Sequence, residues 1–425
     1  MTQELTKESV SARTIAIIGG GVVGAATALS LSTKGYQVTL FEPDEIGAGT
    51  SSGNAGGIVT GAVLPTATPG VLRAMPSYIF DPNGAAVLRL SYVLKILPWL
   101  IRFIASARPK RVASIAAALH PLVSRAMQAH VALADISNAR HLIKPVGWLK
   151  VFASDAGFAD TALERELMTR HGVNFSVLSA KEIEQLEPKL DKGAYKHGLF
   201  QPESGFVDHP KALTQAYFEG AVRHGARHVQ EKVLQVMPQQ SGSIAISTTQ
   251  SKHQFDSVVI AAGAWSKQFV TQVGDRVCLD TERGYHVSFS SGHETLLNRP
   301  VCFPERSCVL SPMHDGISMV SGDELAGLAA PADFRRIRGV IPFSRKALPG
   351  LVNDKVQREW MGYRPSTPDS LPVIGRSPRC SNVFYAFGHG HLGLTLSAIT
   401  AQLISSIVSG EEVPFDMTPY RVDRF

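Results

Sequence analysis

The sequence has little cysteine and no long run of one charge. Its 425 residues include four cysteines, and none of them forms a Cys-x-x-Cys pair or a Cys/His zinc spacing. We therefore expect no disulfide framework, no metal site, and idle thiols in a reducing compartment. The absence of any basic run of five or more residues disfavours nucleic-acid binding. The four cysteines are Cys278, Cys302, Cys308 and Cys380.

The N-terminus also lacks the features of a secretory signal. The first ten residues contain Glu4, Lys7 and Glu8 and no apolar stretch. The prediction is a cytoplasmic protein.

The composition is that of an ordinary globular protein, with 44% hydrophobic and 18% charged residues. A chain of 425 residues is long for one hydrophobic core, so two domains are expected. The formal net charge of +6 suits an anionic substrate, an anionic cofactor or an acidic membrane surface, and it does not choose among them.

One apolar stretch, residues 87–106, raises the question of a membrane. It contains Arg89, Lys95 and Arg102, with Pro98 in the middle, whereas a spanning helix needs about 20 mostly uncharged residues. We expect two short amphipathic helices that lie on a membrane surface. Packing on a partner, or on the protein's own core, explains the same pattern equally well.

Residues 14–44 carry a dinucleotide-binding pattern. The β-branched run TIAII predicts a buried parallel strand, and it leads into Gly19, Gly21 and Gly24 in a G-x-G-x-x-G spacing. The following helix would present its N-terminal amides, at Val22 and Val23, to a pyrophosphate. Glu42 closes the second strand, 18 positions after Gly24, where an acid binds a ribose diol and disfavours an NADP-type ligand.

The loop after Glu42 favours a flavin over a nicotinamide. The segment IGAGTSSGNAGGIVTG, residues 46–61, does not continue into further strand–helix units. Its many backbone amides suit close wrapping of a flat polar ring system and a second contact to phosphates. A flexible surface turn is the simpler alternative.

The remaining pattern predicts an α/β plus α+β fold, with a discontinuous Rossmann-like domain and an antiparallel-sheet substrate domain. Strands are expected at 147–154, 197–208, 227–239 and 256–266, and a helix at 209–226 with Asp208 as its N-cap. Short strands and turns fill 275–345. We assign 14–60, 145–270 and 350–425 to the cofactor domain, 61–144 to a helical insertion, and 271–349 to the substrate domain.

These segments together resemble the D-amino-acid oxidase and dehydrogenase superfamily of FAD-dependent amine oxidoreductases, most closely its bacterial D-amino-acid dehydrogenases. The likeness rests on the glycine motif with Glu42, then GTSSGNAGG, VVIAAGAWS and GYRPSTPDSLPVIG…GHGHLGLTLS, and it spans residues 14–410. It implies noncovalent FAD, because no cysteine lies beside the GYRP element and no histidine lies in the opening motif. The run DTERGYHV is closer to branches that act on D-proline or hydroxy-D-proline.

The resemblance also implies roles for individual residues. Arg364 would bind the substrate carboxylate, while Tyr285 and, less directly, His286 would line the substrate pocket, although Tyr285 could equally be a core aromatic. The glycine loop at 388–395 would meet negative charge on the reduced flavin with amides and a helix dipole. The cofactor contacts implied are Gly19, Gly21, Val22, Val23, Gly24, Glu42, Thr50, Ser51, Ser52, Asn54, Ala55, Gly56, Val233, Ala262, Gly263, Trp265, Gly388, Gly390, Leu392, Gly393, Leu394 and Thr395.

The activity implied is oxidative deamination of D-amino acids by hydride transfer from the α carbon to flavin N5. The products are a 2-oxo acid and ammonia, or a cyclic imine from D-proline-type substrates, and the electrons pass to a respiratory acceptor, a quinone or carrier. Two alternatives remain open. One is an amine oxidase of the glycine or sarcosine type that uses dioxygen, and the other is a flavin subunit that acts mainly through a partner.

Overall fold

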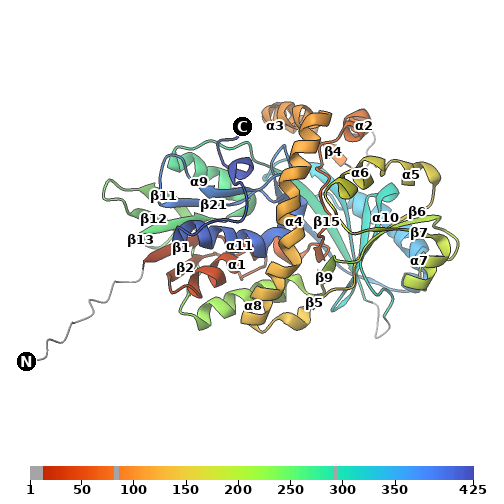
Figure 1. Cartoon of the computed structure of the whole chain (residues 1–425), viewed down its shortest axis with the longest axis horizontal. Helices are drawn as coiled ribbons and strands as arrows, with labels where there is room; N and C mark the ends of the chain where they lie inside the picture. Colours follow the sequence, from red (N-terminus) through yellow and green to blue (C-terminus); the bar gives the residue numbers. More distant parts are fainter. Residues whose placement is uncertain (1–12, 81–85, 291–294) are drawn as a thin grey trace, which may run out of the picture.

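The computed structural model describes residues 13–80, 86–290 and 295–425. The N-terminal residues used to argue against a secretory signal lie outside these ranges. Two large sheets divide the described chain into two parts, and the long helix α4 (Pro109–Ser137) runs down between them in Figure 1.

The first part is built on a six-stranded sheet whose strands come from the beginning, middle and end of the chain. Its order is β10 (Arg227–Val229), β2 (Gln37–Phe41), β1 (Thr14–Ile18), β14 (Ser257–Ile260), β21 (Val383–Phe387) and β20 (Val373–Arg376). All neighbours are parallel except β20 and β21. The prediction of a discontinuous Rossmann-like sheet is confirmed.

Four helices cover one face of this sheet. Helix α1 (Val22–Ser32) is rich in alanine and serine, so α8 (Pro210–Arg223) and α11 (Gly393–Ser409) approach it closely, and α4 packs outside them. Helix α8 begins at Pro210 with His209 as its N-cap, so the predicted cap at Asp208 is wrong. The reason is that Pro210 has no N–H and suits the first helical position.

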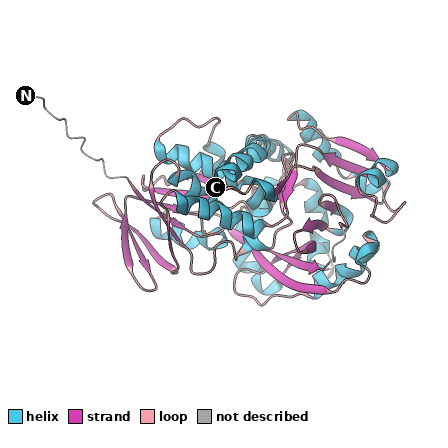
Figure 2. Cartoon of the chain, turned by 90° about the horizontal axis from the view of Figure 1, so that it is seen from below, coloured by secondary structure: helices cyan, strands magenta, loops and turns pink. Residues whose placement is uncertain are grey.

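The opposite face of the sheet carries α9 (Ser266–Val273) and a three-stranded antiparallel sheet of β11 (Val233–Pro238), β12 (Ile244–Thr248) and β13 (Lys252–Phe255). Figure 2 shows this small sheet at the outer edge of the molecule. The predicted single strand at 227–239 is therefore two strands, β10 and β11, in different sheets. The strand expected at 256–266 ends at Ile260, where a turn leads into α9.

The second part is a nine-stranded, mostly antiparallel sheet. Eight strands follow in the order β19 (Val356–Ser366), β15 (Asp280–Phe289), β18 (Gly316–Leu325), β17 (Cys308–Met313), β16 (Val301–Phe303), β6 (Trp148–Phe152), β8 (His197–Gln201) and β7 (Ser176–Ser179), while β4 (Ala86–Leu88) pairs with β18. Only the pairs β16–β6 and β18–β4 are parallel among these strands.

The strand membership differs from the predicted boundaries. Residues 148–201 and 356–366, which we assigned to the cofactor domain, supply strands β6, β7, β8 and β19 to the nine-stranded sheet. The sequence shows where strands lie, but not which sheet each one joins, since pairing also depends on distant partners, such as Val301 for Leu149.

Shorter elements complete the described chain. A small sheet joins β3 (Gly57–Ile58), β9 (Gly205–Val207) and β5 (Ile143–Lys144). The other helices are α2 (Pro69–Phe80), α3 (Val93–Ser106), α5 (Asp155–Ala159), α6 (Ala162–Arg170), α7 (Ala180–Leu186) and α10 (Arg335–Ala347).

Residues 93–106 form one helix, α3, and not the two short helices predicted. Pro98 lies inside it and removes one backbone hydrogen bond near its start, without ending the helix. Helix α3 meets α4 at 92°. Among the described residues, one helical stretch, Gly390–Ser409, is by itself long and apolar enough to cross a membrane, but 61% of its apolar window is buried, as in a core helix. Helices α3 and α4 meet the same criterion only when taken together.

Candidate active site

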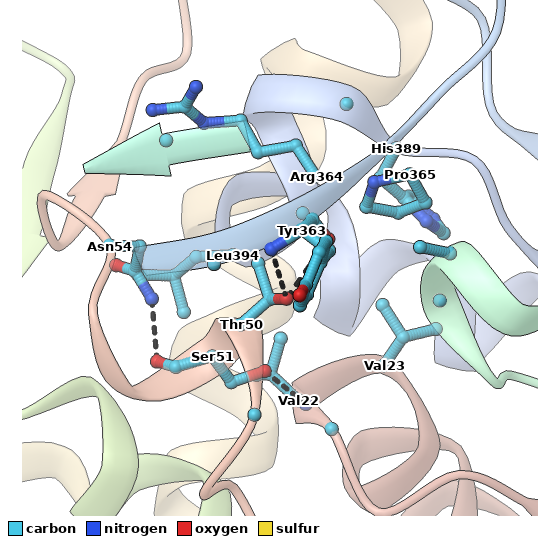
Figure 3. Close-up of a pocket in the computed structure, with 18 of the residues that line it drawn as sticks. Val22, Val23, Thr50, Ser51, Asn54, Tyr363, Arg364, Pro365, His389 and Leu394 are labelled. Atoms are coloured by element: carbon cyan, nitrogen blue, oxygen red, sulfur yellow. Dashed lines mark hydrogen bonds between the residues drawn. The ribbon is translucent and has the colours of Figure 1, made fainter. Parts of the chain in front are cut away.

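A cavity of about 1000 Å³ lies between the two large sheets. Its walls come from the glycine loop after β1, the loop at 49–55, the turn after β14, the segment 389–395, and the facing strands of the nine-stranded sheet. Figure 3 shows Tyr363 and Arg364 on one side of the cavity and Val22 and Val23, at the start of α1, on the other. One continuous space therefore joins the glycine loop to the second sheet.

The glycine motif brings three backbone segments together. Gly19 has φ +111°, and a Cβ there would lie 2.5 Å from the carbonyl oxygen of Ala261. A Cβ on Gly24 would overlap the carbonyl oxygen of Gly19. Gly21 is the N-cap of α1, and Val22 and Val23 line the cavity, so the positive end of this helix borders a space that could take a pyrophosphate.

Glu42 follows β2 and lines the cavity beside the glycine loop. Its Oε2 accepts a hydrogen bond from Gly20 N at 2.8 Å. Burial raises the pKa of the Glu42 carboxyl, and the N–H bonds from Gly20 and Asp44 offset this only partly. Val233 lines the same end of the cavity from β11, as predicted from its place in the sequence.

The loop after Glu42 is a defined structure held by its own side chains. Ser51 Oγ accepts from Val22 N at 2.9 Å, and Asn54 Nδ2 donates to Ser51 O at 2.7 Å. Thr50 Oγ1 donates to Tyr363 O at 3.0 Å and accepts from Tyr363 N at 3.2 Å, which ties the loop to β19. Thr50, Ser51, Asn54 and Ala55 line the cavity, whereas Ser52 and Gly56 do not.

The turn after β14 forms another wall. Ala262, Gly263 and Trp265 all line the cavity, and the Trp265 ring packs edge-on against Tyr363 at 5.5 Å between ring centroids. This contact is a second link between the two sheets, next to the Thr50 link.

The segment before α11 supplies a further group of predicted contacts. Gly390, Leu392, Gly393, Leu394 and Thr395 line the cavity, while Gly388 does not. Thr395 Oγ1 donates to Gly57 O at 3.0 Å and fixes the start of α11.

Sequence reasoning missed the support of this segment by His130. That residue is fully buried in α4, with Nε2 2.8 Å from Leu394 O and Nδ1 2.8 Å from Tyr217 Oη. Burial lowers the pKa of His130 to about 4, so the ring is neutral at physiological pH. Neutral His130 then donates from Nε2 to the carbonyl and accepts at Nδ1 from the tyrosine.

Arg364 reaches the cavity from β19, and its side chain is 15% exposed. Arg364 pairs with Glu282 of β15, and its side chain extends over Gly284, where a Cβ would overlap Cζ and Nη2 of the guanidinium. The missing side chain at Gly284 is therefore what lets Arg364 lie over β15. This glycine also lines the cavity, and the motif search missed it.

The structure contradicts the predicted roles of Tyr285 and His286 in lining the pocket. Tyr285 lies on the opposite face of β15 from Gly284, because successive strand residues alternate. Its ring packs against Phe334, and its hydroxyl donates to Glu324 Oε2 at 2.6 Å. His286 is 3.0 Å from Ser318 Oγ and packs near Trp360, and neither residue lines the cavity.

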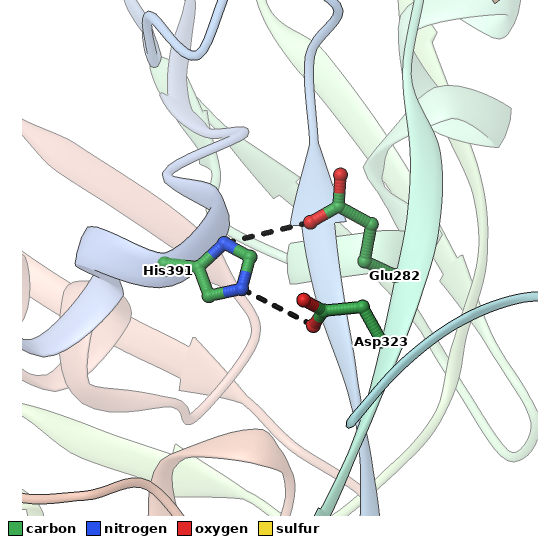
Figure 4. Close-up of side chains that lie close together, drawn as sticks. All are labelled: Glu282, Asp323 and His391. Atoms are coloured by element: carbon green, nitrogen blue, oxygen red, sulfur yellow. Dashed lines mark hydrogen bonds and ion pairs between the residues drawn. The ribbon is translucent and has the colours of Figure 1, made fainter. Parts of the chain in front are cut away.

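Three further ionisable groups, Glu282, Asp323 and His391, meet in Figure 4, and Asp323 joins them to Arg364. Asp323 on β18 accepts a hydrogen bond from Arg364 Nη1, and His391 Nε2 lies 3.2 Å from the same carboxylate. His391 Nδ1 is 3.5 Å from Glu282 Oε2 on β15. We call Glu282, Asp323, Arg364 and His391 the charged cluster. Arg364, Asp323 and His391 line the cavity.

The pKa shifts in the cluster follow from its charges. Burial would raise the pKa of Asp323, but Arg364 and then His391 outweigh it and hold that pKa well below its usual value. Burial and Arg364 lower the pKa of His391, while Asp323 and Glu282 more than compensate and raise it. Burial raises the pKa of Glu282.

The donor atoms of Glu282, Asp323 and His391 lie within 4.8 Å of one another, a spacing that a metal ion could use. The guanidinium bonded to Asp323 already supplies a positive charge there and would repel a cation. We therefore read the cluster as an ion-pair network.

Cys302 on β16 also lines the cavity, which the sequence did not predict. Burial raises its pKa to about 11, so the thiol is protonated at neutral pH and is a poor nucleophile. That agrees with a noncovalent cofactor, which stays a prediction.

A dinucleotide loop at one end of a cavity and a charged cluster on a second sheet at the other define a flavin-type oxidoreductase. Residues 14–407 match the FAD dependent oxidoreductase family (DAO), and the chain belongs to that family. A protein of Bradyrhizobium diazoefficiens named D-amino-acid oxidase is 35% identical over 97% of this chain and 99% of its own length. A D-amino acid dehydrogenase of Vibrio atlanticus is 26% identical over 93% of this chain and 96% of its own.

The fold is also that of known structures. Glycine oxidase from Geobacillus kaustophilus superposes with a TM-score of 0.78, at 22% identity, over 97% of this chain and 99% of the other. The cofactor is FAD, and the cavity fits it. Glu42, the start of α1, the loop at 49–55, segment 389–395 and Arg364 all line this one cavity and could hold the cofactor there.

Proposed function

We propose that this enzyme oxidises D-α-amino acids to 2-oxo acids and ammonia, or D-proline-type substrates to cyclic imines, and passes the electrons to a respiratory acceptor. The observation that carries the proposal is the place of Arg364. Its guanidinium opens into the same cavity as the glycine loop and the segment 389–395. A substrate held there lies within the space that FAD shares.

Bound FAD supplies the two-electron acceptor for this chemistry. The protein's part is to orient the substrate. A guanidinium binds a carboxylate through two parallel hydrogen bonds, and this fixes the α carbon more firmly than a single contact. Gly284 leaves room for the guanidinium, and the links from Thr50 and Trp265 to Tyr363 hold β19 against the cofactor side. Such positioning is a large part of the rate enhancement in reactions between bound groups.

The names of the relatives support an amino acid as the donor. The 35% identical protein is called a D-amino-acid oxidase, and several relatives at 24–27% identity are called D-amino acid dehydrogenases. An oxidase passes its electrons to oxygen, and a dehydrogenase passes them to another acceptor. The names therefore favour the D configuration of the substrate but do not identify the electron acceptor.

A respiratory acceptor is supported by the outer face of α3. Leu94, Leu97, Ile101 and Ile104 recur at three- and four-residue spacing and are 85%, 44%, 59% and 44% exposed. The inner face of the same helix is buried through Ile96, Trp99, Leu100 and Phe103. An exposed apolar row of this kind is costly in water and suits the surface of a bilayer.

The charges around α3 favour an anionic surface. Between Glu45 and Asp135 the chain has one acidic residue, Asp81, and eight lysines and arginines. Of these, Lys95, Arg102, Arg108, Lys110 and Arg111 are exposed on α3 and at the start of α4. We propose that α3 holds the cytoplasmic enzyme on the inner face of the membrane, where a quinone or carrier takes its electrons.

The first test is an anaerobic visible spectrum during titration with D- and L-amino acids and cyclic amines. Bleaching of the oxidised flavin by D-isomers alone is the expected result. A yellow protein that no amine bleaches would contradict the proposal and favour a flavin subunit that needs a partner. The name of the 35% identical relative makes an oxidase the second candidate, so peroxide formation in air at the rate of substrate oxidation would overturn the respiratory acceptor.

The membrane proposal is tested by cosedimentation with vesicles containing anionic lipid. The double variant Leu94→Ser/Ile101→Ser should lose vesicle binding and keep its flavin spectrum, because both side chains are exposed. Val352, 60% exposed and outside α3, provides a matched control as Val352→Ser. Equal binding of wild type and the double variant would show that α3 is not the contact.

A further inference from the structure

The residue expected to hold the substrate carboxylate already has an anionic partner. Arg364 Nη1 donates to Asp323, which comes from β18, a different strand of the sheet. A substrate carboxylate at Arg364 therefore arrives next to a second carboxylate. That is unfavourable for a simple anion, so the pair needs an explanation in terms of the ligand.

The exposure of the charged cluster shows which groups can meet a ligand. The side chains of Asp323 and His391 are 36% and 39% exposed, and both line the cavity. Glu282 is 10% exposed and does not line it. Asp323 is thus the acidic group of the cluster that faces the substrate space, while Glu282 lies behind His391.

An α-amino acid carries a carboxylate and an amine on the same carbon. A guanidinium beside a carboxylate is the complementary arrangement: the guanidinium binds the carboxylate, and the carboxylate accepts an N–H from the amine. We propose that Asp323 binds the substrate amine while Arg364 binds its carboxylate, and that His391, held between Asp323 and Glu282, positions Asp323. This inference rests on the proposed function and identifies the group that recognises the substrate amine.

The same contact favours the reaction. When hydride leaves the α carbon of the neutral amine, the nitrogen lone pair forms the C=N bond and the nitrogen becomes positively charged. The carboxylate of Asp323 faces that developing charge from a fixed position, which stabilises the transition state more than the neutral ground state. Primary and secondary amines both gain from it.

The test compares two ligands with the FAD-loaded protein and its Asp323→Asn variant. Benzoate supplies a carboxylate without an amine, and its binding is followed by the change in the flavin spectrum. The D-amino acid that reduces the wild type best supplies both groups, and its apparent Kd comes from the concentration dependence of anaerobic flavin reduction. Asn is nearly isosteric with Asp and removes only the charge.

We expect opposite shifts. Asp323→Asn should bind benzoate about ten-fold more tightly, because the repulsion is gone, and the D-amino acid about ten-fold or more weakly, because the amine has lost its partner. A structural role for Asp323 would weaken both ligands together, and that result, or unchanged benzoate affinity, would overturn the proposal.

Glu324→Gln is the matched control. It makes the same change at the next residue of β18, whose side chain faces away and binds Tyr285 and Arg89. It should lower thermal stability without moving the two affinities in opposite directions. If it moves them as Asp323→Asn does, the effect is not specific to the amine.

The positioning role of His391 has a separate readout. It is faced by Glu282 from β15, Asp323 from β18 and Arg364 from β19. Loss of its proton makes the cluster more negative, so benzoate should bind wild type more weakly as the pH rises from 6 to 9. His391→Gln should remove this dependence, and an unchanged pH profile would overturn the role of His391.

Failure of the proposed function is distinguishable from failure of this inference. If no amino acid reduces the flavin of the wild-type protein, that experiment by itself contradicts the proposed function. The benzoate measurement still tests whether Asp323 opposes a carboxylate at Arg364.

Discussion

The two ends of the cavity differ in the chemical groups that line them. The dinucleotide end is made mostly of backbone, with glycines that let β1, α1 and β14 approach and a helix start, at Val22 and Val23, that lines the cavity. The substrate end is made of the charged side chains of the cluster, which come from strands β15, β18 and β19 and from the segment before α11. These residues lie between positions 282 and 391 of the sequence. Where backbone segments are in close contact, there is no room for an added side-chain atom. Where charged side chains form the site, ligand binding depends on the balance of their charges. The two ends should therefore fail in different ways.

The largest effect is expected at the backbone end. Gly24→Ala would place a methyl group on the carbonyl of Gly19, so the glycine loop cannot close and FAD should not bind. The purified variant should show no visible flavin absorption, even after incubation with FAD. Gly339→Ala, also a helical glycine but with open space around it, is the control and should keep the full flavin spectrum.

A large effect without loss of FAD is expected at the substrate end. Gly284→Ala would push the Arg364 guanidinium out of place, and misplacement of a positioning group costs about 100-fold in kcat/KM. Steady-state kinetics with the best amino acid would measure this loss, while the flavin spectrum remains that of wild type. Loss of flavin from Gly284→Ala would break the separation between the two ends.

A smaller effect is expected for Glu42→Gln. The amide still accepts from Gly20 N, but the anion that we predict to bind the ribose is lost, which should weaken FAD about ten-fold. Fluorescence titration of the apoprotein would give the Kd. Glu42 follows β2 of the six-stranded sheet, whereas the strands of the charged cluster belong to the nine-stranded sheet. KM for the amino acid at saturating FAD should therefore not change, and a raised KM would contradict the distinction.

The smallest effect concerns pH and stability. The folded protein raises the pKa of His391, so its protonation stabilises the fold below about pH 6.5, the ordinary histidine value, and this contribution is lost as the pH rises through the folded pKa. Thermal unfolding at pH 6 and pH 9 should show a larger Tm difference between wild type and His391→Gln at pH 6. A larger difference at pH 9 would mean that the ring is stabilised in its neutral form.

The same contrast explains what could be predicted from the sequence. The glycine loop and Glu42 were predicted from a local pattern whose spacing reflects backbone geometry, and the segment 388–395 from the family resemblance. All of these except Gly24 and Gly388 line the cavity. Asp323 and Glu282 were missed because they lie in ordinary strand sequences, and only the register of β15 between β18 and β19 brings them to Arg364. The prediction for Tyr285 was wrong because successive residues of a strand point to opposite faces. A local pattern could not show that Gly284, and not Tyr285, is on the face toward the cavity.

The sheet memberships of β6, β7, β8 and β19 could not be predicted for a related reason. Hydrophobic alternation predicts a strand, but either sheet offers a partner of the same character. The choice is made by packing between segments far apart in the chain, and a single sequence carries no direct record of that.

The strands of the six-stranded sheet come from distant parts of the chain, and this limits how early the sheet can form during synthesis of the protein. Strand β1 pairs with β14, and Thr14 is hydrogen-bonded to Asp256, 242 positions later. Strand β21, at Val383–Phe387, then closes the other side of β14. A growing chain therefore holds its first strand unpaired on that side until more than half of it has left the ribosome, and it cannot complete the sheet until nearly the end. Contacts this distant form slowly and leave strand edges exposed meanwhile. Yield in the cell should accordingly depend on chaperones, and removal of the last 40 or so residues should leave insoluble protein and not a smaller flavoprotein.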